Sequence, residues 1–136
     1  MKIKVDINVL VDVLQKRNPF FSASAKICEL IHSRIVAGVV PSHAVTTVFY
    51  LVEKCAKRHA AVVALDWMLS LFDMVPEDKE IFSLAKTVGF RDFEDAVVAA
   101  DAQKSGCDFF VTRNIADFAL SPFKAVIPEE MLEIAE

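Results

Sequence analysis

The chain has 136 residues, of which 54% are hydrophobic and 25% are charged, and its formal net charge at pH 7 is -4. This length can bury one substantial core but is short for two, so we expect a single domain over residues 1–136. The composition excludes intrinsic disorder as the default, and the acidic balance provides no overall basic field that would draw the chain to nucleic acid.

The sequence carries no sign of a membrane or secreted protein. Charged or polar residues interrupt every apolar run before it is long enough to cross a bilayer, and the N-terminus lacks a signal-peptide pattern. The three cysteines, Cys28, Cys55 and Cys107, have the spacing of neither a disulfide framework nor a zinc site. We therefore expect a cytoplasmic protein without a membrane partner, in which the cysteines are mostly buried small hydrophobic residues.

Short apolar runs alternate with stretches of helical periodicity along the chain. The first half predicts a strand at 3–5, a helix that begins near Asn8, a helix over 20–37 with Gly38 as its C-cap, a strand at 38–42, and helices over 43–58 and 60–72. The second half predicts a strand at 74–76, helices over 77–88 and 92–105, a strand at 109–112, one helical turn over 114–118, a strand at 125–127 and a final helix from Pro128. This alternation predicts an α/β fold in which helices cover both faces of a parallel sheet.

Three acidic residues lie near the predicted carboxyl ends of strands. Asp6 follows the first strand, Asp117 lies beyond the fourth, and Asp95 begins the helix that leads into the fourth. Ligands of open parallel sheets bind outside the carboxyl ends of the strands, so these side chains would converge on one crevice. Clustered carboxylates repel one another unless they share a proton or a cation, and Mg²⁺ or Mn²⁺ prefers oxygen ligands. The pattern predicts a metal site or carboxyl groups with shifted pKa values.

Each of these acids also fits a helix cap. Asp6 would cap the helix that follows it, and Asp92 and Asp95 have the spacing of a capping box in "DFED". Asn114 and Asp117 repeat that spacing in "NIAD". Capping therefore remains an alternative explanation for every acid taken singly.

Other residue patterns indicate no further chemistry. The glycines form no phosphate-binding loop, which excludes a P-loop nucleotide hydrolase. His32, His43 and His59 lack the spacing of metal ligands, and we expect them in surface or capping roles.

Three blocks cover nearly the whole chain: "VDINVLVDVL" at 5–14, "PSHAVTTVFYLVEK" at 41–54 and "FRDFEDAVVAADAQKSGCDFFVTRNIADF" at 90–118. They resemble the PIN-domain family, in particular its small toxin ribonucleases of the VapC kind. The last block is the most specific, because an Asp that begins an Ala-rich helix is followed by a strand ending in "VTRN" and then by "ADF". The resemblance implies a single-domain α/β/α sandwich with a mostly parallel sheet of about five strands.

The resemblance also implies a metal-dependent ribonuclease and assigns roles to residues. Asp6, Asp95 and Asp117 match the catalytic and metal-binding acids of the family, and Asp92 lies close by as a further metal ligand. Polar support would come from Asn8, Thr47, Thr112 and Asn114. Asp6 and Asp95 would hold one Mg²⁺ or Mn²⁺ that activates a water molecule, while Asp117 holds a second ion or orients the water.

One acid of the family pattern is missing. The helix after the second strand usually begins with an acid, whereas this chain has Thr47 at the expected position. Glu53 would point elsewhere on an ideal helix.

RNA and protein partners follow from the same resemblance. Arg113, Lys16, Arg17 and Lys54 are candidates for binding the RNA backbone, with a solvated surface as the alternative for each. A small antitoxin protein would neutralise the enzyme, and a homodimer would form through the apolar faces of the helices over 20–37 and 43–58.

Two other functions remain open at this point. A PIN-like fold that has lost catalysis would bind RNA or a protein partner, which the absent acid at Thr47 supports. A phosphatase of the haloacid-dehalogenase kind would use Asp6 as a phosphate-accepting nucleophile, because "DINVL" partly resembles its opening motif.

Overall fold

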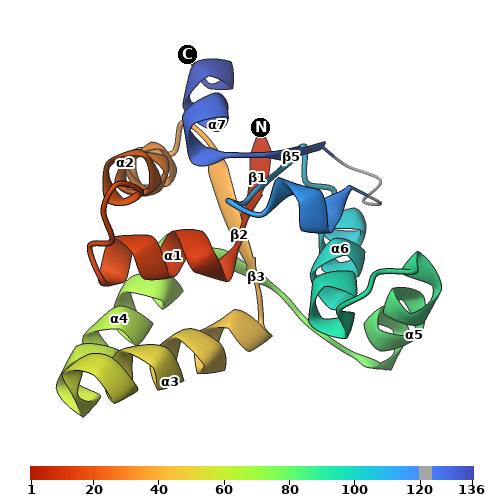
Figure 1. Ribbon diagram of the computed structural model, residues 1–136, viewed down its shortest axis with the longest axis horizontal. Coiled ribbons are helices and arrows are strands. Elements are labelled where there is room, and N and C mark those ends of the chain that lie inside the picture. Colours follow the sequence, from red (N-terminus) through yellow and green to blue (C-terminus); the bar gives the residue numbers. More distant parts are fainter. Residues whose placement is uncertain (120–123) are drawn as a thin grey trace.

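The computed structural model describes residues 1–119 and 124–136, and within these residues five parallel strands form one sheet (Figure 1). The strands are β1 (Lys2–Val5), β2 (Ala37–Pro41), β3 (Asp73–Val75), β4 (Phe109–Val111) and β5 (Lys124–Val126), in the spatial order β3-β2-β1-β4-β5. Ile3 in the central strand pairs with Gly38 on one side and Phe109 on the other. Because all neighbouring strands are parallel, their carboxyl ends lie along one edge of the sheet.

Helices cover both faces of the sheet, as the sequence predicts. The helices are α1 (Ile7–Leu14), α2 (Phe21–His32), α3 (His43–Ala56), α4 (Arg58–Leu71), α5 (Lys79–Val88), α6 (Phe93–Ser105) and α7 (Pro128–Ile134), and a 3₁₀ turn, η1, spans Ile115–Phe118. In Figure 1, α1, α2 and α7 lie on one side of the strands, and α5 and α6 lie on the other. Both termini lie at the end of the molecule opposite to the carboxyl ends of β1 and β2 (Figure 1). The α/β/α fold with a five-stranded parallel sheet is confirmed.

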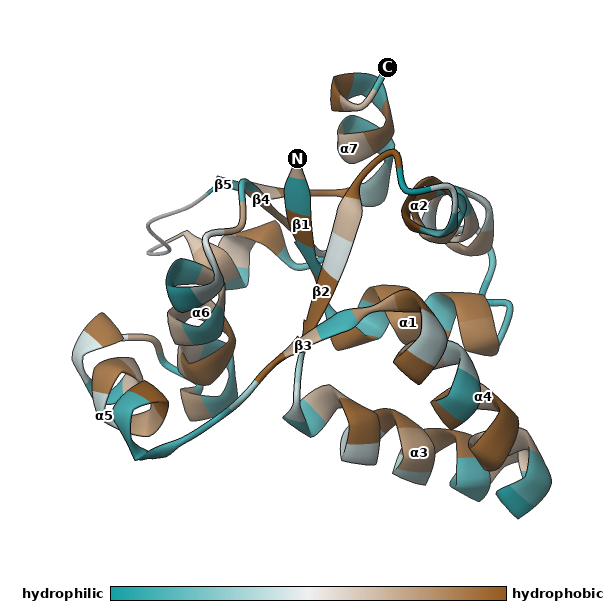
Figure 2. Cartoon of the chain, turned by 180° about the vertical axis from the view of Figure 1, so that it is seen from behind, coloured by the Kyte–Doolittle hydropathy of each residue, from teal (hydrophilic) through white to brown (hydrophobic). Residues whose placement is uncertain are grey.

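The hydrophobic core explains the composition of the central elements. Hydrophobic residues predominate along β2 (Figure 2), where Val39 and Val40 are buried. The main core lies between the sheet and helices α1 to α4. In α6 every residue from 96 to 102 is buried, because this helix is enclosed by α5, η1 and the sheet. The Ala-rich sequence of α6 permits this close packing.

Several predicted boundaries are wrong for local physical reasons. Helix α2 ends at His32, not at residue 37, because the chain turns at Arg34 with a φ of 60°. Gly38 is not a C-cap but a residue of β2, where a Cβ would lie 2.6 Å from Cδ1 of Ile31. Helix α5 begins at Lys79 with Asp78 as its N-cap, which leaves Glu77 in the preceding loop. The C-terminal boundary of α6 is confirmed, since Gly106 adopts a φ of 69° there.

The cysteines match the prediction only in part. All three are free thiols, but only Cys28 is buried; Cys55 is exposed and Cys107 is half-buried. Cys55 lies in the last turn of α3, where the helix faces solvent. Among the helices that the structure describes, none has the length and apolar character needed to cross a membrane.

Candidate active site

Asp6 lies at the carboxyl end of β1 and joins two strands. Its Oδ1 accepts a hydrogen bond of 2.7 Å from the backbone N of Ile7, and its Oδ2 accepts one of 2.6 Å from Oγ1 of Thr112. Burial raises the pKa of Asp6 above its ordinary value, although these two hydrogen bonds act in the opposite direction. Asp6 is thus the N-cap of α1, and the same carboxylate also faces the residues that follow β4. The capping role and the site role do not exclude each other.

Asp95 and Asp117 line a common pocket beside this edge of the sheet. The pocket has a volume of about 420 Å³, and its lining includes Asp92 and Arg91. Burial is the largest cause that raises the pKa of Asp95 to about 6. The negative charges of Asp92, Asp6 and Asp117 raise this pKa further, so the carboxylates are close enough to repel one another. The fold therefore brings together the acids that the sequence singled out.

The two predicted capping boxes behave differently. Oδ1 of Asp92 accepts hydrogen bonds from the backbone N atoms of Glu94 and Asp95, at 2.8 and 3.3 Å, and so caps α6. Within the described part of the chain, the Asn114 side chain makes no such bond to η1, so that predicted cap is wrong. The backbone N of Asn114 instead donates to Oγ1 of Thr112, at 3.0 Å. Thr112 takes the supporting position because its hydroxyl reaches both Asn114 and Asp6.

Helix α3 contributes no carboxylate at the expected position. Thr47 is half-buried in the second turn of α3. Glu53 does not take over, since its carboxylate lies 3.6 Å from Nη1 of Arg58 at the other end of the helix. Asn8, in the first turn of α1, has a buried Oδ1 without a hydrogen-bond partner among the described residues.

The predicted RNA-binding cations occupy two kinds of environment. Lys16, Arg17 and Lys54 are exposed. Arg113 instead donates to both carboxylate oxygens of the buried Asp12, from Nε at 2.6 Å and from Nη2 at 3.0 Å. Its guanidinium also lies 4.1 Å from the centre of the Phe20 ring. These contacts favour a structural role for Arg113.

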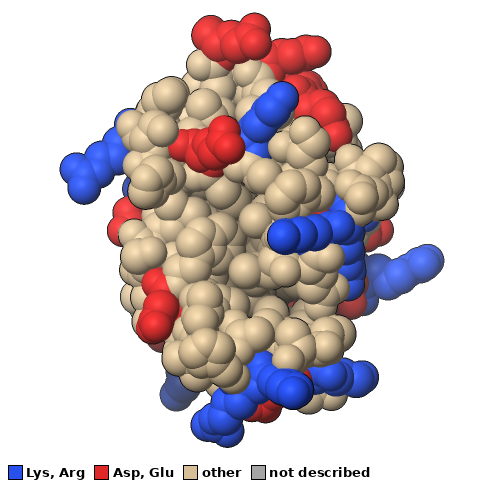
Figure 3. Space-filling view, turned by 90° about the vertical axis from the view of Figure 1, so that its left-hand side faces the viewer, with Lys and Arg blue, Asp and Glu red and all other residues tan. Residues whose placement is uncertain are grey.

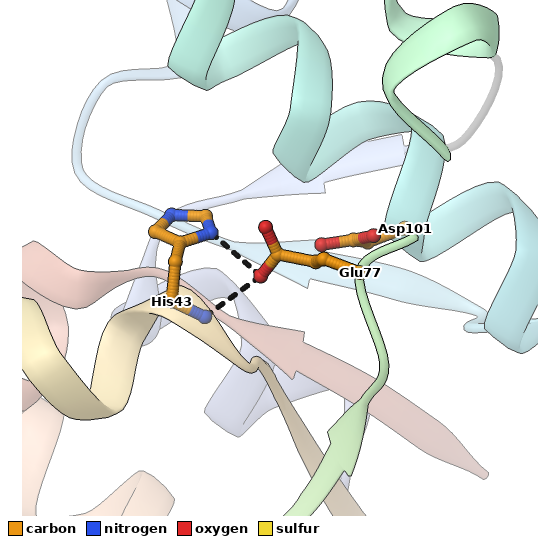
Figure 4. A group of neighbouring side chains, drawn as sticks. All are labelled: His43, Glu77 and Asp101. Atoms are coloured by element: carbon orange, nitrogen blue, oxygen red, sulfur yellow. Dashed lines mark hydrogen bonds and ion pairs between the residues drawn. The ribbon is translucent and has the colours of Figure 1, made fainter. Parts of the chain in front are cut away.

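His43 was expected in a surface or capping role, and this prediction is wrong. Oε1 of Glu77 accepts hydrogen bonds of 2.7 Å from the backbone N of His43 and 3.0 Å from Oγ of Ser42, and it lies 2.7 Å from Nδ1 of His43 (Figure 4). Burial by itself would raise the pKa of Glu77, but the hydrogen bonds from His43 and Ser42 outweigh burial and lower it. His43 follows β2 as Asp6 follows β1, so the carboxyl-end rule could have found it.

A buried lysine and aspartate lie behind this pair. Nζ of Lys4 is 3.5 Å from Oδ2 of Asp101, and both side chains are fully buried. Burial lowers the pKa of Lys4 and raises that of Asp101 to about 6, while each charge partly offsets the effect on the other. The side chains of His43, Glu77 and Asp101 present possible metal-ligand atoms within 4.8 Å of one another (Figure 4).

The chemistry of the acid cluster fits a divalent cation. Oxygen atoms of Asp6, Asp95 and Asp117 are hard ligands, and a bound cation would offset the neighbouring negative charges that, after burial, raise the pKa of Asp95. Asp95 lies in α6 and Asp117 lies in η1, so the acids come from different elements of the fold. Among the described residues, three potential ligand atoms lie within 4.8 Å of one another only at His43, Glu77 and Asp101, so a single ion shared by Asp6, Asp95 and Asp117 would require their side chains to move closer together.

Comparisons with known proteins agree with this geometry. Over 137 residues the chain is 24% identical to Ribonuclease VapC1 of Aquifex aeolicus (strain VF5), a match that covers 97% of this chain and 94% of that protein. A chain in the crystal structure of VapBC2 from Rickettsia felis, bound to a DNA fragment from its promoter, superposes with a TM-score of 0.74 at 18% identity, covering 93% of this chain and 98% of the other.

Other solved structures share the fold. PAE2754 from Pyrobaculum aerophilum superposes with a TM-score of 0.68 at 19% identity, covering 99% of this chain and 95% of the other. A chain of DNA-bound VapBC from Salmonella typhimurium gives a TM-score of 0.72 at 17% identity, covering 94% and 98%. Residues 2–116, which contain Asp6 and Asp95 and end one residue before Asp117, match the family described as PIN domain. The chain belongs to the PIN-domain family.

Proposed function

We propose that this protein is an endoribonuclease that hydrolyses RNA phosphodiester bonds with a divalent metal ion, and that it is the toxin of a toxin–antitoxin pair. The observation that carries the proposal is the environment of Asp95, whose pKa is raised to about 6 by burial and by the charges of Asp92, Asp6 and Asp117. The similarity to Ribonuclease VapC1 supports the same reaction. The proposal treats residues 1–136 as one PIN domain, because α7 packs against α2.

Asp6 and Asp95 would hold one ion, and Asp117 would hold a second ion or orient the attacking water. A divalent ion at these carboxylates supplies charge neutralisation at the scissile phosphate and lowers the pKa of a bound water molecule. Thr112 fixes the orientation of Asp6 through its 2.6 Å hydrogen bond. Mg²⁺ and Mn²⁺ both suit an all-oxygen ligand set, and we propose either as the cofactor.

The RNA would approach a surface that is acidic at its centre, so its binding depends on cations around the site. Lys16, Arg17 and Lys54 are exposed, and Arg91 lines the acidic pocket itself, so we propose these residues as contacts to phosphates. Action on RNA implies a cytoplasmic location.

An antitoxin and a second copy of this chain are the proposed protein partners. Solved structures that resemble this chain include VapBC of Rickettsia felis and of Salmonella typhimurium, and a toxin-antitoxin complex from Klebsiella pneumoniae. Uncharged side chains occupy the centre of the face that carries α1, α2 and α4, and charged side chains surround it (Figure 3). A pocket of about 550 Å³ between α1, α3 and α4 is lined mainly by apolar residues, among them Val63 and Trp67.

The experiment is cleavage of total RNA by the purified protein with Mg²⁺ or Mn²⁺. We expect cleavage that EDTA abolishes and that Asp95→Asn reduces at least about a hundredfold, the range seen when electrostatic groups of an active site are removed. The matched control is Asp66→Asn, because Asp66 is exposed on α4, outside the acid cluster. Equal cleavage by the Asp95→Asn and Asp66→Asn proteins would contradict the assignment.

A PIN domain that binds without catalysis is the second candidate, and one observation favours it: the first turns of α3 present Thr47 where the family pattern has an acid. Membership of the PIN-domain family argues against the phosphatase alternative. Metal binding without cleavage of any RNA would favour the non-catalytic candidate.

A further inference from the structure

We propose that His43 and Glu94 form a metal position on the α3 side of the active site, in which Nε2 of His43 is a ligand and Glu77 holds the imidazole in place. This inference rests on the proposed function, because it assigns a further ligand to the metal site of the same nuclease. It begins with the acid that α3 lacks at Thr47. His43 lies four residues earlier on α3, and side chains at that spacing project from the same face of a helix.

The orientation of the His43 ring is fixed on one side. Oε1 of Glu77 lies 2.7 Å from Nδ1 and also accepts a hydrogen bond from the backbone N of the same residue. An ionised carboxylate can only accept, so Nδ1 carries a proton, and Nε2 is the ring nitrogen that is left to bind a metal ion. At protein metal sites, a histidine that binds the metal through one ring nitrogen usually donates the N–H of its other ring nitrogen to a carboxylate, a carbonyl or water.

The other ring nitrogen of His43 faces Glu94. Nε2 of His43 is buried and has no hydrogen-bond partner in the part of the chain that the structure describes. Its neighbour is Oε1 of Glu94, at 3.4 Å. Glu94 precedes Asp95 in the first turn of α6, and its charge contributes to the raised pKa values of Asp95 and Asp6. Nε2 thus lies beside Glu94, which directly precedes Asp95 in the sequence.

Nε2 of His43 and Oε1 of Glu94 face each other, and either a proton or a metal ion between them would join the two atoms. Two ligand atoms that lie about 2.1 Å from a shared ion are about 3.0 Å apart in an octahedral shell and about 3.4 Å apart in a tetrahedral one. The separation of 3.4 Å between Nε2 and Oε1 falls within this range. The pair therefore has both the chemistry and the spacing of two ligands of one ion.

The neighbouring group of His43, Glu77 and Asp101 is less suited to hold the ion itself. The hydrogen bond to Glu77 occupies Nδ1, the ring nitrogen on that side. Nζ of Lys4, 3.5 Å from Asp101, already supplies a positive charge there. In this proposal Glu77 and Asp101 support the imidazole ring, and only Nε2 of His43 and the carboxylate of Glu94 bind the ion.

An imidazole ligand changes the preferred metal. Nitrogen donors favour Mn²⁺, Co²⁺ and Zn²⁺ over Mg²⁺, which takes oxygen ligands almost exclusively. In the family pattern the corresponding helix supplies an acid, so this chain would depend more on the softer ions.

The test is pulsed electron paramagnetic resonance of the full-length protein loaded with Mn²⁺, together with calorimetric titration of the same ion. We expect nitrogen modulation of the Mn²⁺ signal in the wild type, and a change of its frequency when the histidines carry ¹⁵N. His43→Gln should remove the modulation and weaken Mn²⁺ binding at least about tenfold, and Glu77→Gln should weaken binding by a similar factor. His59→Gln is the matched control, because His59 is exposed on α4, and it should change neither quantity.

The outcomes separate this inference from the proposed nuclease function. If Mn²⁺ binds and Asp95→Asn abolishes binding, but the wild type shows no nitrogen modulation, His43 is not a ligand and the nuclease assignment stands. Modulation that depends on His43 but accompanies no RNA cleavage would support the ligand and contradict the nuclease. The ¹⁵N experiment shows whether a histidine binds Mn²⁺, and modulation that persists in a His32→Gln/His59→Gln protein assigns the ligand to His43 even if the His43→Gln protein does not fold. Absence of any Mn²⁺ binding would overturn both proposals.

Discussion

Thr112 donates a hydrogen bond of 2.6 Å from Oγ1 to Oδ2 of Asp6, and this bond joins the carboxyl ends of two adjacent strands of the sheet. Oγ1 of Thr112 also accepts a hydrogen bond of 3.0 Å from the backbone N of Asn114, so the hydroxyl holds the start of the segment that leads to Asp117. Thr112 is fully buried. One side chain therefore sets the relative position of two acids that come from different parts of the chain.

The first prediction concerns Thr112→Val, which keeps the shape of the side chain but removes both hydrogen bonds. Oδ2 of Asp6 and the backbone N of Asn114 would lose their partner, so we expect the free energy of unfolding to fall by about 1–3 kcal/mol. RNA cleavage should fall more steeply than stability under conditions where the protein is fully folded. Urea denaturation and cleavage assays measure the two effects, with Thr87→Val as the control, because Thr87 is exposed and its hydroxyl bonds only to the carbonyl of Leu84 within α5. Wild-type cleavage by Thr112→Val would show that the bond does not position Asp6.

The second prediction is that pH has opposite effects on stability and on metal binding. The pKa of Asp95 is about 6 in the folded chain and 3.8 in its ordinary state, so the folded protein holds this proton more tightly than the unfolded one. The free energy of unfolding of the metal-free protein should therefore fall as pH rises from about 4 to above about 6. Mn²⁺ affinity should rise over the same window, by roughly tenfold per pH unit below the pKa, because the ion competes with the proton.

Asp95→Asn provides the control for this pH dependence. The amide cannot ionise, so the variant should unfold at a temperature a few degrees higher than the wild type in EDTA at pH 7, and this difference should vanish near pH 4. Mn²⁺ should stabilise the wild type but not the variant. Thermal unfolding followed by circular dichroism measures each quantity. A variant less stable than the wild type at pH 7 would mean that Asp95 serves the fold and not a metal site.

Local patterns in the sequence are sufficient to predict the sheet and its acidic edge. Apolar runs rich in β-branched residues mark β1 and β2, and the glycine at 106 marks the end of α6 because it adopts a positive φ. Asp6 and Asp117 follow from the rule that ligands bind at the carboxyl ends of parallel strands. These features depend on residues that are close in sequence, or on a property shared by all parallel sheets.

The group formed by His43, Glu77, Lys4 and Asp101 depends on contacts between segments that are distant in the sequence. Glu77 and His43 are 34 positions apart, and they meet because β3 and β2 are adjacent in the sheet. Lys4 alternates with apolar residues in "KIKV", a pattern typical of a strand with one solvated face, yet it is fully buried against Asp101 of α6. Periodicity cannot reveal such a pair, because the strand order and the position of α6 decide which charges meet.

The third prediction concerns the buried pair of Lys4 and Asp101. Lys4→Met would leave Asp101 buried without its cation, and we expect a loss of about 3–5 kcal/mol in the free energy of unfolding at pH 7. Asp101→Asn in the same protein should restore part of this loss, because no charge then remains to be compensated. Urea denaturation of the single and double variants gives the coupling energy.

The exposed pair of Glu53 and Arg58, 3.6 Å apart, serves as the comparison. Glu53→Gln should change stability by less than about 1 kcal/mol, because solvent screens both charges. Equal effects of Lys4→Met and Glu53→Gln would show that water reaches the Lys4 site in solution.

The last prediction separates the two roles of Arg113, which the sequence places among the RNA-binding residues and the structure places against Asp12 and Phe20. Arg113→Lys keeps the positive charge but loses the paired hydrogen bonds of 2.6 and 3.0 Å and the stacking on Phe20, so the free energy of unfolding should fall by about 1–3 kcal/mol. Lys16→Ala removes an exposed charge and should leave stability unchanged while weakening RNA binding and its dependence on salt. Urea denaturation and RNA titration of the same two variants test the contrast. If Arg113→Lys kept wild-type stability and bound RNA more weakly than Lys16→Ala, the contact with Asp12 would be incidental and Arg113 would belong to the RNA-binding surface.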